Sequence, residues 1–222
     1  MELSAVEIRV LGCLVEKQLT TPQAYPLTES ALITACNQTT NRNPVVTYEQ
    51  GTVRRALLDL RRENLVKLVH RPGDRVEKHR HLLDETLGLS PAQIAVLSVL
   101  MLRGPQTAGE LRTRTERLHG FAHPSEVEAV LEELAAREPE PLAERLPRQP
   151  GQKEVRFRHL LTEEFPTASA SAAEAAGIAP TSAPPAPVTQ TAARPSLEMD
   201  ALRAEVAELR ARVAQLEARL RD

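Results

Sequence analysis

The sequence predicts an α+β chain that is mainly helical, with small β-hairpins beside the helices. Three observations lead to this prediction. The segment LSAVEIRVLGCL at residues 3–14 returns at residues 89–100 as LSPAQIAVLSVL. The segment RPGDRVEKHRHLL at residues 71–83 returns at residues 149–161 as QPGQKEVRFRHLL. Both copies start with helix-capping residues and contain a Pro-Gly turn near their end, so one helix-and-hairpin unit is expected twice.

Each unit is expected to begin with three helices. Ser4 with Glu7, and Ser90 with Gln93, have the spacing of a capping box, and apolar residues follow at helical intervals. Second helices are expected from Thr28 and Thr107, and third helices over 47–63 and 124–137. The third helices carry apolar stripes formed by Val53, Leu57 and Leu60, and by Val127, Leu131 and Leu134.

Two short strands joined by the Pro-Gly turn are expected after each third helix. Three helices closed by a β-hairpin is the plan of a winged-helix domain, a variant of the helix-turn-helix. The sequence therefore predicts two tandem winged-helix domains, over residues 1–83 and 84–161.

The residues that could hold a metal are better explained as core residues. In the aligned hairpins Val155, Phe157 and His159 alternate on one face, and His79 takes the position of Phe157. This favours core or half-buried histidines over a His79-x-His81 metal pair. The two cysteines, Cys13 and Cys36, have no C-x-x-C spacing and lie among apolar residues, so both are expected to be buried and reduced. No cofactor is expected.

The composition changes after residue 161. Residues 162–195 are rich in Ala, Pro and Ser, and such a segment buries too little surface to offset its chain entropy, so a disordered linker is predicted. Residues 196–222 have a heptad pattern, which predicts a coiled coil that joins a parallel homodimer; a lone solvated helix is the alternative. The predicted dimerisation residues are Met199, Leu202, Val206, Leu209, Val213, Leu216 and Leu220.

The formal net charge of -2 is unevenly distributed. Residues 1–83 hold 12 Lys or Arg against 9 Asp or Glu, whereas residues 84–161 hold 10 against 12 and residues 162–222 hold 6 against 9. The first third is therefore the candidate for contact with a polyanion. No apolar run has the length of a membrane helix and no signal pattern is visible, so no membrane contact and a cytoplasmic location are expected.

Several segments carry a resemblance to a known family. In the first domain these are Glu16-Lys17-Gln18, Thr20-Thr21-Pro22, Tyr25-Pro26-Leu27, Ala35-Cys36-Asn37-Gln38, Asn41-Arg42 and Pro44-Val45. In the second domain the segment is LRGPQTAGELRTRTERLHGF at residues 102–121. Over roughly residues 1–161 the chain resembles the YceH-like family of bacterial proteins. The resemblance implies a tandem winged-helix fold with no established activity, substrate or cofactor.

Catalytic motifs are missing from the sequence, so an enzyme is not expected. The first hypothesis is binding of double-stranded DNA by the first domain, because a winged helix sets its third helix in the major groove and its hairpin along the backbone. The candidate contacts are Asn41, Arg42, Asn43, Arg54, Arg55, Arg61, Arg62, Arg71, Arg75, Lys78 and Arg80.

The alternative is a scaffold that binds other proteins without contacting DNA. The predicted third helix of the second domain favours it, because its outer side carries glutamates that would repel phosphates. These residues are Glu126, Glu128, Glu132 and Glu133.

Overall fold

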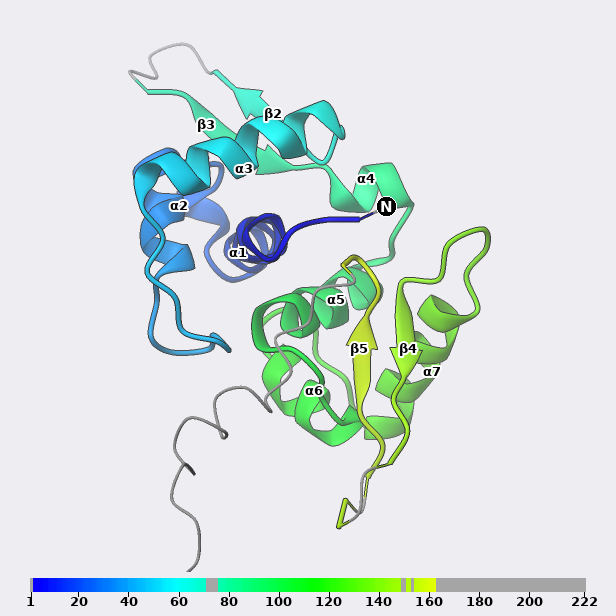
Figure 1. The fold of residues 1–222 in the computed structure, drawn as a ribbon. Coiled ribbons are helices and arrows are strands. Elements are labelled where there is room, and N and C mark those ends of the chain that lie inside the picture. The colour runs from blue at the N-terminus through cyan, green and yellow to red at the C-terminus, as the bar shows by residue number, and fades with distance from the viewer. Residues whose placement is uncertain (1, 71–75, 149–150, 153, 163–222) are drawn as a thin grey trace, which may run out of the picture. The chain divides into compact units, whose positions relative to one another are not determined.

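The computed structural model describes residues 2–70, 76–148, 151–152 and 154–162 (Figure 1). The predicted linker and the predicted coiled coil, with its seam from Met199 to Leu220, lie outside the described residues. Arg71 and Arg75, two of the candidate DNA contacts, also lie outside them. In the described part of the chain, no helix is long and apolar enough to cross a membrane.

The described residues form an α+β fold of helices with small antiparallel sheets, as predicted. The first repeat consists of α1 (Ala5–Thr20), the 3-10 turn η1 (Pro22–Ala24), β1 (Leu27–Thr28), α2 (Glu29–Cys36), α3 (Gln50–Arg62), β2 (Val66–Val69) and β3 (Lys78–His81). The second repeat consists of α5 (Pro91–Arg103), α6 (Ala108–Thr115), α7 (Pro124–Ala135), β4 (Ala143–Arg145) and β5 (Phe157–His159). Each repeat therefore has three helices followed by an antiparallel hairpin.

The predicted starts of α1, α5 and α6 are confirmed, and each of these helices begins with a capping box. Ser4 and Ser90 form complete capping boxes with Glu7 and Gln93, and Thr107 forms one at the start of α6. Each cap satisfies backbone N–H groups that have no partner within the helix.

Two features of the helices differ from the prediction. α3 begins at Gln50 rather than near residue 47, because Asn37 pairs with the backbone of Tyr48 in both directions, at 2.9 and 2.8 Å. This pairing commits Tyr48 to a loop conformation. A short helix that was not expected, α4 (Leu83–Leu87), connects the repeats and ends at Gly88, whose φ of 60° suits glycine.

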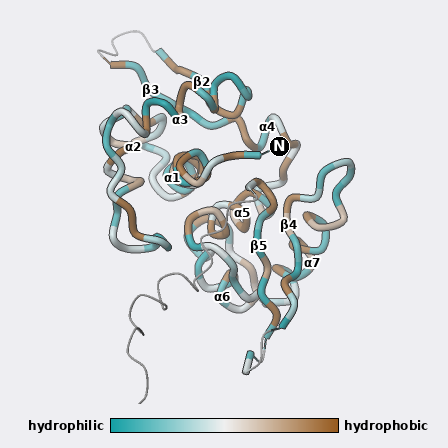
Figure 2. The backbone as a smooth tube through the Cα atoms, in the orientation of Figure 1, coloured by the Kyte–Doolittle hydropathy of each residue, from teal (hydrophilic) through white to brown (hydrophobic). Residues whose placement is uncertain are grey.

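The first helices of the two repeats, α1 and α5, pack closely against each other (Figure 2). Gly12 of α1 and Ser98 of α5 occupy equivalent positions in the repeat, 86 residues apart, and they meet where the helices cross. The Ser98 hydroxyl donates to the Gly12 carbonyl at 3.3 Å. A Cβ atom at Gly12 would lie 2.9 Å from Leu102 Cδ2, so glycine is needed for this close approach. Through this crossing the two repeats share one core.

The predicted burial of the histidines and cysteines is confirmed. His79 and Phe157, which take equivalent positions in the two hairpins, are each 7% exposed. His81 and His159 are buried as well, and Cys13 and Cys36 are buried and free. Within the described ranges no group of three or more His, Cys, Asp or Glu side chains is placed to hold a metal ion.

We expect Gly12→Leu to lower the free energy of unfolding by about 1–3 kcal/mol, because the new side chain overpacks the crossing of α1 and α5. Gly51→Leu in α3 is the matched control, since no heavy atom lies within 4 Å of a Cβ at Gly51. That variant should match the parent or be more stable by up to about 1 kcal/mol. Urea unfolding measures both. Equal effects at the two sites would contradict the close crossing.

We also expect stability to fall between pH 7 and pH 5. Burial lowers the pKa values of His81 and His159 to about 4, from an ordinary value of 6.5. Well above pH 6.5 both are neutral whether the chain is folded or unfolded. Below it the unfolded chain takes up protons that the folded chain refuses, and each histidine costs about 2 kcal/mol by pH 5.

Urea unfolding at the two pH values tests this expectation. His159→Gln removes one of the two groups and should weaken the pH dependence. His123→Gln, at an exposed histidine, should leave it as in the parent. A parent protein that is equally stable at pH 7 and pH 5 would show that the histidines are not buried in neutral form.

Candidate nucleic-acid interface

α3 has one buried side and one exposed side. Val53, Leu57 and Leu60 are buried in the core. The opposite side is exposed along the whole helix, and at its centre Leu58 is 45% exposed. The arginines predicted to contact DNA lie on this exposed side, one turn before and one turn after Leu58: Arg54, Arg55, Arg61 and Arg62. We call these four arginines and Leu58 the α3 face.

Acidic side chains hold three of these arginines. Arg54 donates to Glu29 of α2 through Nε at 3.1 Å and through Nη2 at 2.9 Å. Arg55 Nε and Arg62 Nη1 donate to the two oxygens of Asp59, at 2.8 and 2.7 Å. Hydrogen bonds from Arg54 lower the pKa of Glu29, and those from Arg55 lower the pKa of Asp59. Both carboxylates therefore stay ionised and compete with any other anion for these arginines.

Arg61 differs from its neighbours. It is exposed, and its side chain forms no hydrogen bond or ion pair with another residue that the structure describes. An external anion can therefore bind the Arg61 guanidinium, and no internal contact has to be broken first.

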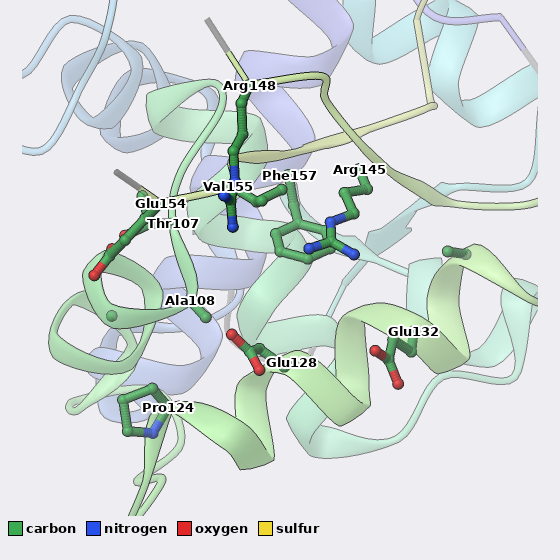
Figure 3. Close-up of a pocket in the computed structure, with 12 residues that line it drawn as sticks. Thr107, Ala108, Pro124, Glu128, Glu132, Arg145, Arg148, Glu154, Val155 and Phe157 are labelled. Atoms are coloured by element: carbon green, nitrogen blue, oxygen red, sulfur yellow. The ribbon is translucent and has the colours of Figure 1, made fainter. Parts of the chain in front are cut away.

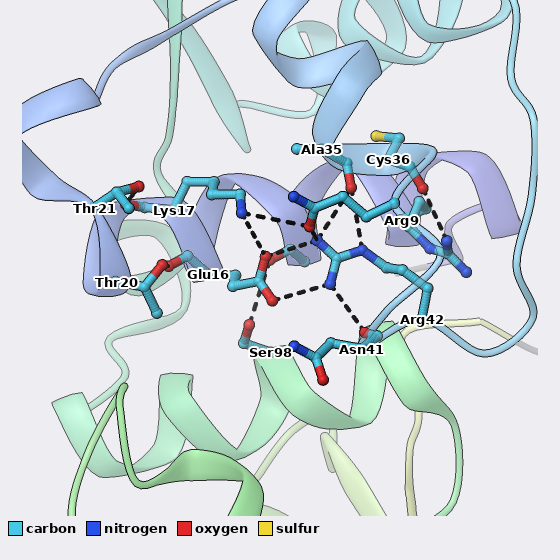
Figure 4. A network of polar contacts seen from close by, with 12 residues as sticks. Arg9, Glu16, Lys17, Thr20, Thr21, Ala35, Cys36, Asn41, Arg42 and Ser98 are labelled. Carbon is cyan, nitrogen blue, oxygen red and sulfur yellow. Dashed lines mark hydrogen bonds and ion pairs between the residues drawn. The ribbon is translucent and has the colours of Figure 1, made fainter. Parts of the chain in front are cut away.

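The structure places Arg42 inside the protein, which corrects the prediction that it contacts DNA. Its side chain binds Glu16 at 2.7 and 2.9 Å, the Ala35 carbonyl at 3.1 Å and Gln38 at 2.9 Å (Figure 4). The residue is only 6% exposed. Burial raises the pKa of Glu16, but the bonds from Arg42 outweigh this effect and the pKa lies below its ordinary value. Arg42 thus ties the loop after α2 to α1, and its side chain is used within the fold.

Asn41 and Asn43 are exposed, but they contact the second repeat. The Asn43 backbone donates to the Leu102 carbonyl at 2.9 Å, and its side chain donates to the Arg103 carbonyl at 3.4 Å. The Asn41 side chain accepts a hydrogen bond from Arg103. Asn41 also has a φ of 60°, a left-handed conformation that asparagine tolerates. Both residues therefore connect this loop to the end of α5, rather than extending the α3 face.

The hairpin residues of the first repeat are placed less favourably than α3. Lys78 and Arg80 lie on β3 and are half-buried, and Arg80 forms an ion pair with Glu85. Of the basic candidate contacts in the described residues, the α3 arginines are exposed, whereas Arg42 is buried and Lys78 and Arg80 are half-buried. The ion pairs with Asp59 could have been anticipated from their i,i+4 and i,i+3 spacing. The pair between Arg54 and Glu29 joins two helices and has no such signal in the sequence.

The equivalent surface of the second repeat has the opposite charge. Aligning the apolar stripes of α3 and α7 places Glu128 at the position of Arg54 and Glu132 at the position of Leu58. Both glutamates are exposed. Exposed positions contribute little to packing, so the shared core does not account for this difference in charge.

Comparison with known proteins identifies relatives over most of the described chain. Residues 3–152 match the family model described as "Protein of unknown function, DUF480". A UPF0502 protein of Geobacter sulfurreducens is 56% identical over 162 residues, which cover 73% of each chain. UPF0502 proteins of Opitutus terrae and Klebsiella pneumoniae are 52% and 46% identical, covering 77% and 75% of this chain and 74% and 78% of theirs.

The match of the family model and these identities agree with the resemblance to uncharacterised bacterial proteins that the sequence motifs indicated. The chain belongs to the DUF480 family, and it is similar to proteins named UPF0502.

Proposed function

We propose that the two repeats are winged-helix domains and that the first of them binds double-stranded DNA through the α3 face. The observation that carries this proposal is the contrast between α3 and α7. The α3 face presents four exposed arginines around an exposed leucine, while the five equivalent positions of α7 hold two glutamates and three alanines and carry no basic residue. A helix of this kind suits the major groove, where guanidinium groups bind phosphates and guanine edges and an apolar side chain meets thymine methyl groups.

Binding of DNA at the α3 face requires that the paired arginines leave their internal ion pairs. Glu29 and Asp59 hold three of the four arginines. DNA phosphates would have to replace these carboxylates, and exposed ion pairs contribute little to stability, so the exchange is not costly. The net attraction is then modest, in keeping with the small positive balance of the first 83 residues. The proposal therefore predicts weak binding that is sensitive to salt.

The second repeat supports a different role for α7. Its exposed Glu128 and Glu132 would repel phosphates. We therefore propose that at most the first repeat of each chain contacts DNA through its third helix, and that the second repeat binds other ligands. A scaffold that binds only proteins is the competing proposal, and it predicts no affinity for DNA.

We expect Arg54→Ala with Arg61→Ala to weaken binding to a random-sequence duplex about tenfold or more at low salt, and to reduce the salt slope by about 2. Fluorescence anisotropy with a labelled duplex measures both quantities. The matched control is Arg117→Ala with Arg145→Ala, which removes two exposed arginines from the second repeat. If the control weakens binding as much, general charge rather than the α3 face governs the affinity.

In the same assay, a second pair of substitutions should strengthen binding to the duplex. Glu29→Gln with Asp59→Asn releases three arginines and removes two negative charges, so affinity should rise several-fold. Glu128→Gln with Glu132→Gln makes the same change of charge on α7 and should have a much smaller effect. Unchanged affinity in the first variant would contradict a phosphate contact at the α3 arginines.

A further inference from the structure

A cavity of about 360 Å³ lies in the second repeat, between the start of α6, the outer side of α7 and the β4–β5 hairpin (Figure 3). This volume falls within the range of sites for small molecules. Phe157 and Val155 supply an apolar surface from the hairpin, and Ala108 adds to it from α6. Phe157 is itself buried, at 7% exposed, so this surface is fixed by the core.

The cavity has opposite charges on two of its sides. Glu128 and Glu132 line it from α7, where a spacing of four residues puts both on the same side of the helix. Arg145 and Arg148 line it from the hairpin, and Glu154 adds one carboxylate there. Within the part of the chain that the structure describes, none of these five side chains forms an ion pair or hydrogen bond.

Other charged residues of the same hairpin are paired. Arg156 forms an ion pair with Glu110 at 3.0 Å, and Arg158 forms one with Glu144. The described part of the hairpin therefore forms ion pairs away from the cavity, while its charged side chains around the cavity have no partner among the described residues. Opposite charges that face a shared space without meeting can both be satisfied by one molecule that carries a cation and an anion.

We propose that this cavity binds a small zwitterion of the α-amino-acid type with an apolar side chain. Its ammonium group would lie at Glu128 and Glu132, and its carboxylate at Arg145 and Arg148. Its side chain would cover Phe157 and Val155. A ligand with a single charge would leave one side of the cavity unmatched. The proposal is independent of DNA binding, because it uses no residue of the first repeat.

Titrating the full chain with L-leucine, followed by NMR, tests this proposal. Leucine should shift the resonances of Ala108, Val155 and Phe157. N-acetyl-L-leucine lacks the ammonium group and L-leucinamide lacks the carboxylate. Each analogue should bind about tenfold more weakly than leucine, because each loses a charge-assisted contact.

Paired variants assign each charge to its partner. Glu128→Gln with Glu132→Gln should abolish the preference for leucine over N-acetyl-leucine, and Arg145→Gln with Arg148→Gln should abolish the preference over leucinamide. Glu116→Gln with Arg117→Gln, at exposed positions that do not line the cavity, should bind as the parent does. The proposal is overturned if leucine gives no shifts at the cavity up to its solubility limit, or if both analogues bind as well as leucine.

Discussion

The crossing of α1 and α5 at Gly12 and Ser98 is the contact on which the rest of the described fold depends. The two positions are equivalent in the repeat, so each unit contributes the same small site to the contact. Small residues let the two backbones approach, and the apolar residues around them then become buried on all sides of both helices. Neither helix would be stable with that much apolar surface in water. The repeats therefore stabilise each other.

Polar contacts at two other places in the first repeat reinforce this crossing. The Leu3 backbone donates to the Leu161 carbonyl at 2.9 Å, which ties the start of the first repeat to the end of the second. Arg42 binds Glu16 of α1, and the neighbouring Asn43 binds the end of α5. A buried arginine is tolerated only when its charge and its hydrogen bonds are matched. The loop after α2 thus holds the two repeats together, and its polar residues are used within the fold.

The local elements could be predicted from the sequence, whereas several contacts between them could not. Ser4, Ser90 and Thr107 cap helices through residues only three positions away, so a short window of sequence contains the whole interaction. The burial of His79 followed from its alignment with Phe157. The prediction for Arg42 was wrong because its carboxylate partner, Glu16, is 26 residues away in the chain. Sequence spacing does not indicate that a charged side chain will be buried against a partner so distant in the chain. The shared core of the repeats was missed for the same reason.

Folding and recognition make separate demands on the two repeats. The apolar stripes of α3 and α7 are alike and are both buried in the shared core. The outer sides of the two helices do not take part in this packing, and there the charges have opposite signs. The central claim is that the positive side, the α3 face, binds duplex DNA. Its most direct test is a salt titration of the parent protein with a random-sequence duplex. We predict that the logarithm of the binding constant falls linearly with the logarithm of salt, with a slope of about −2 to −4, as expected when up to four arginines contact phosphates. An absence of binding at the lowest salt concentration would contradict the claim.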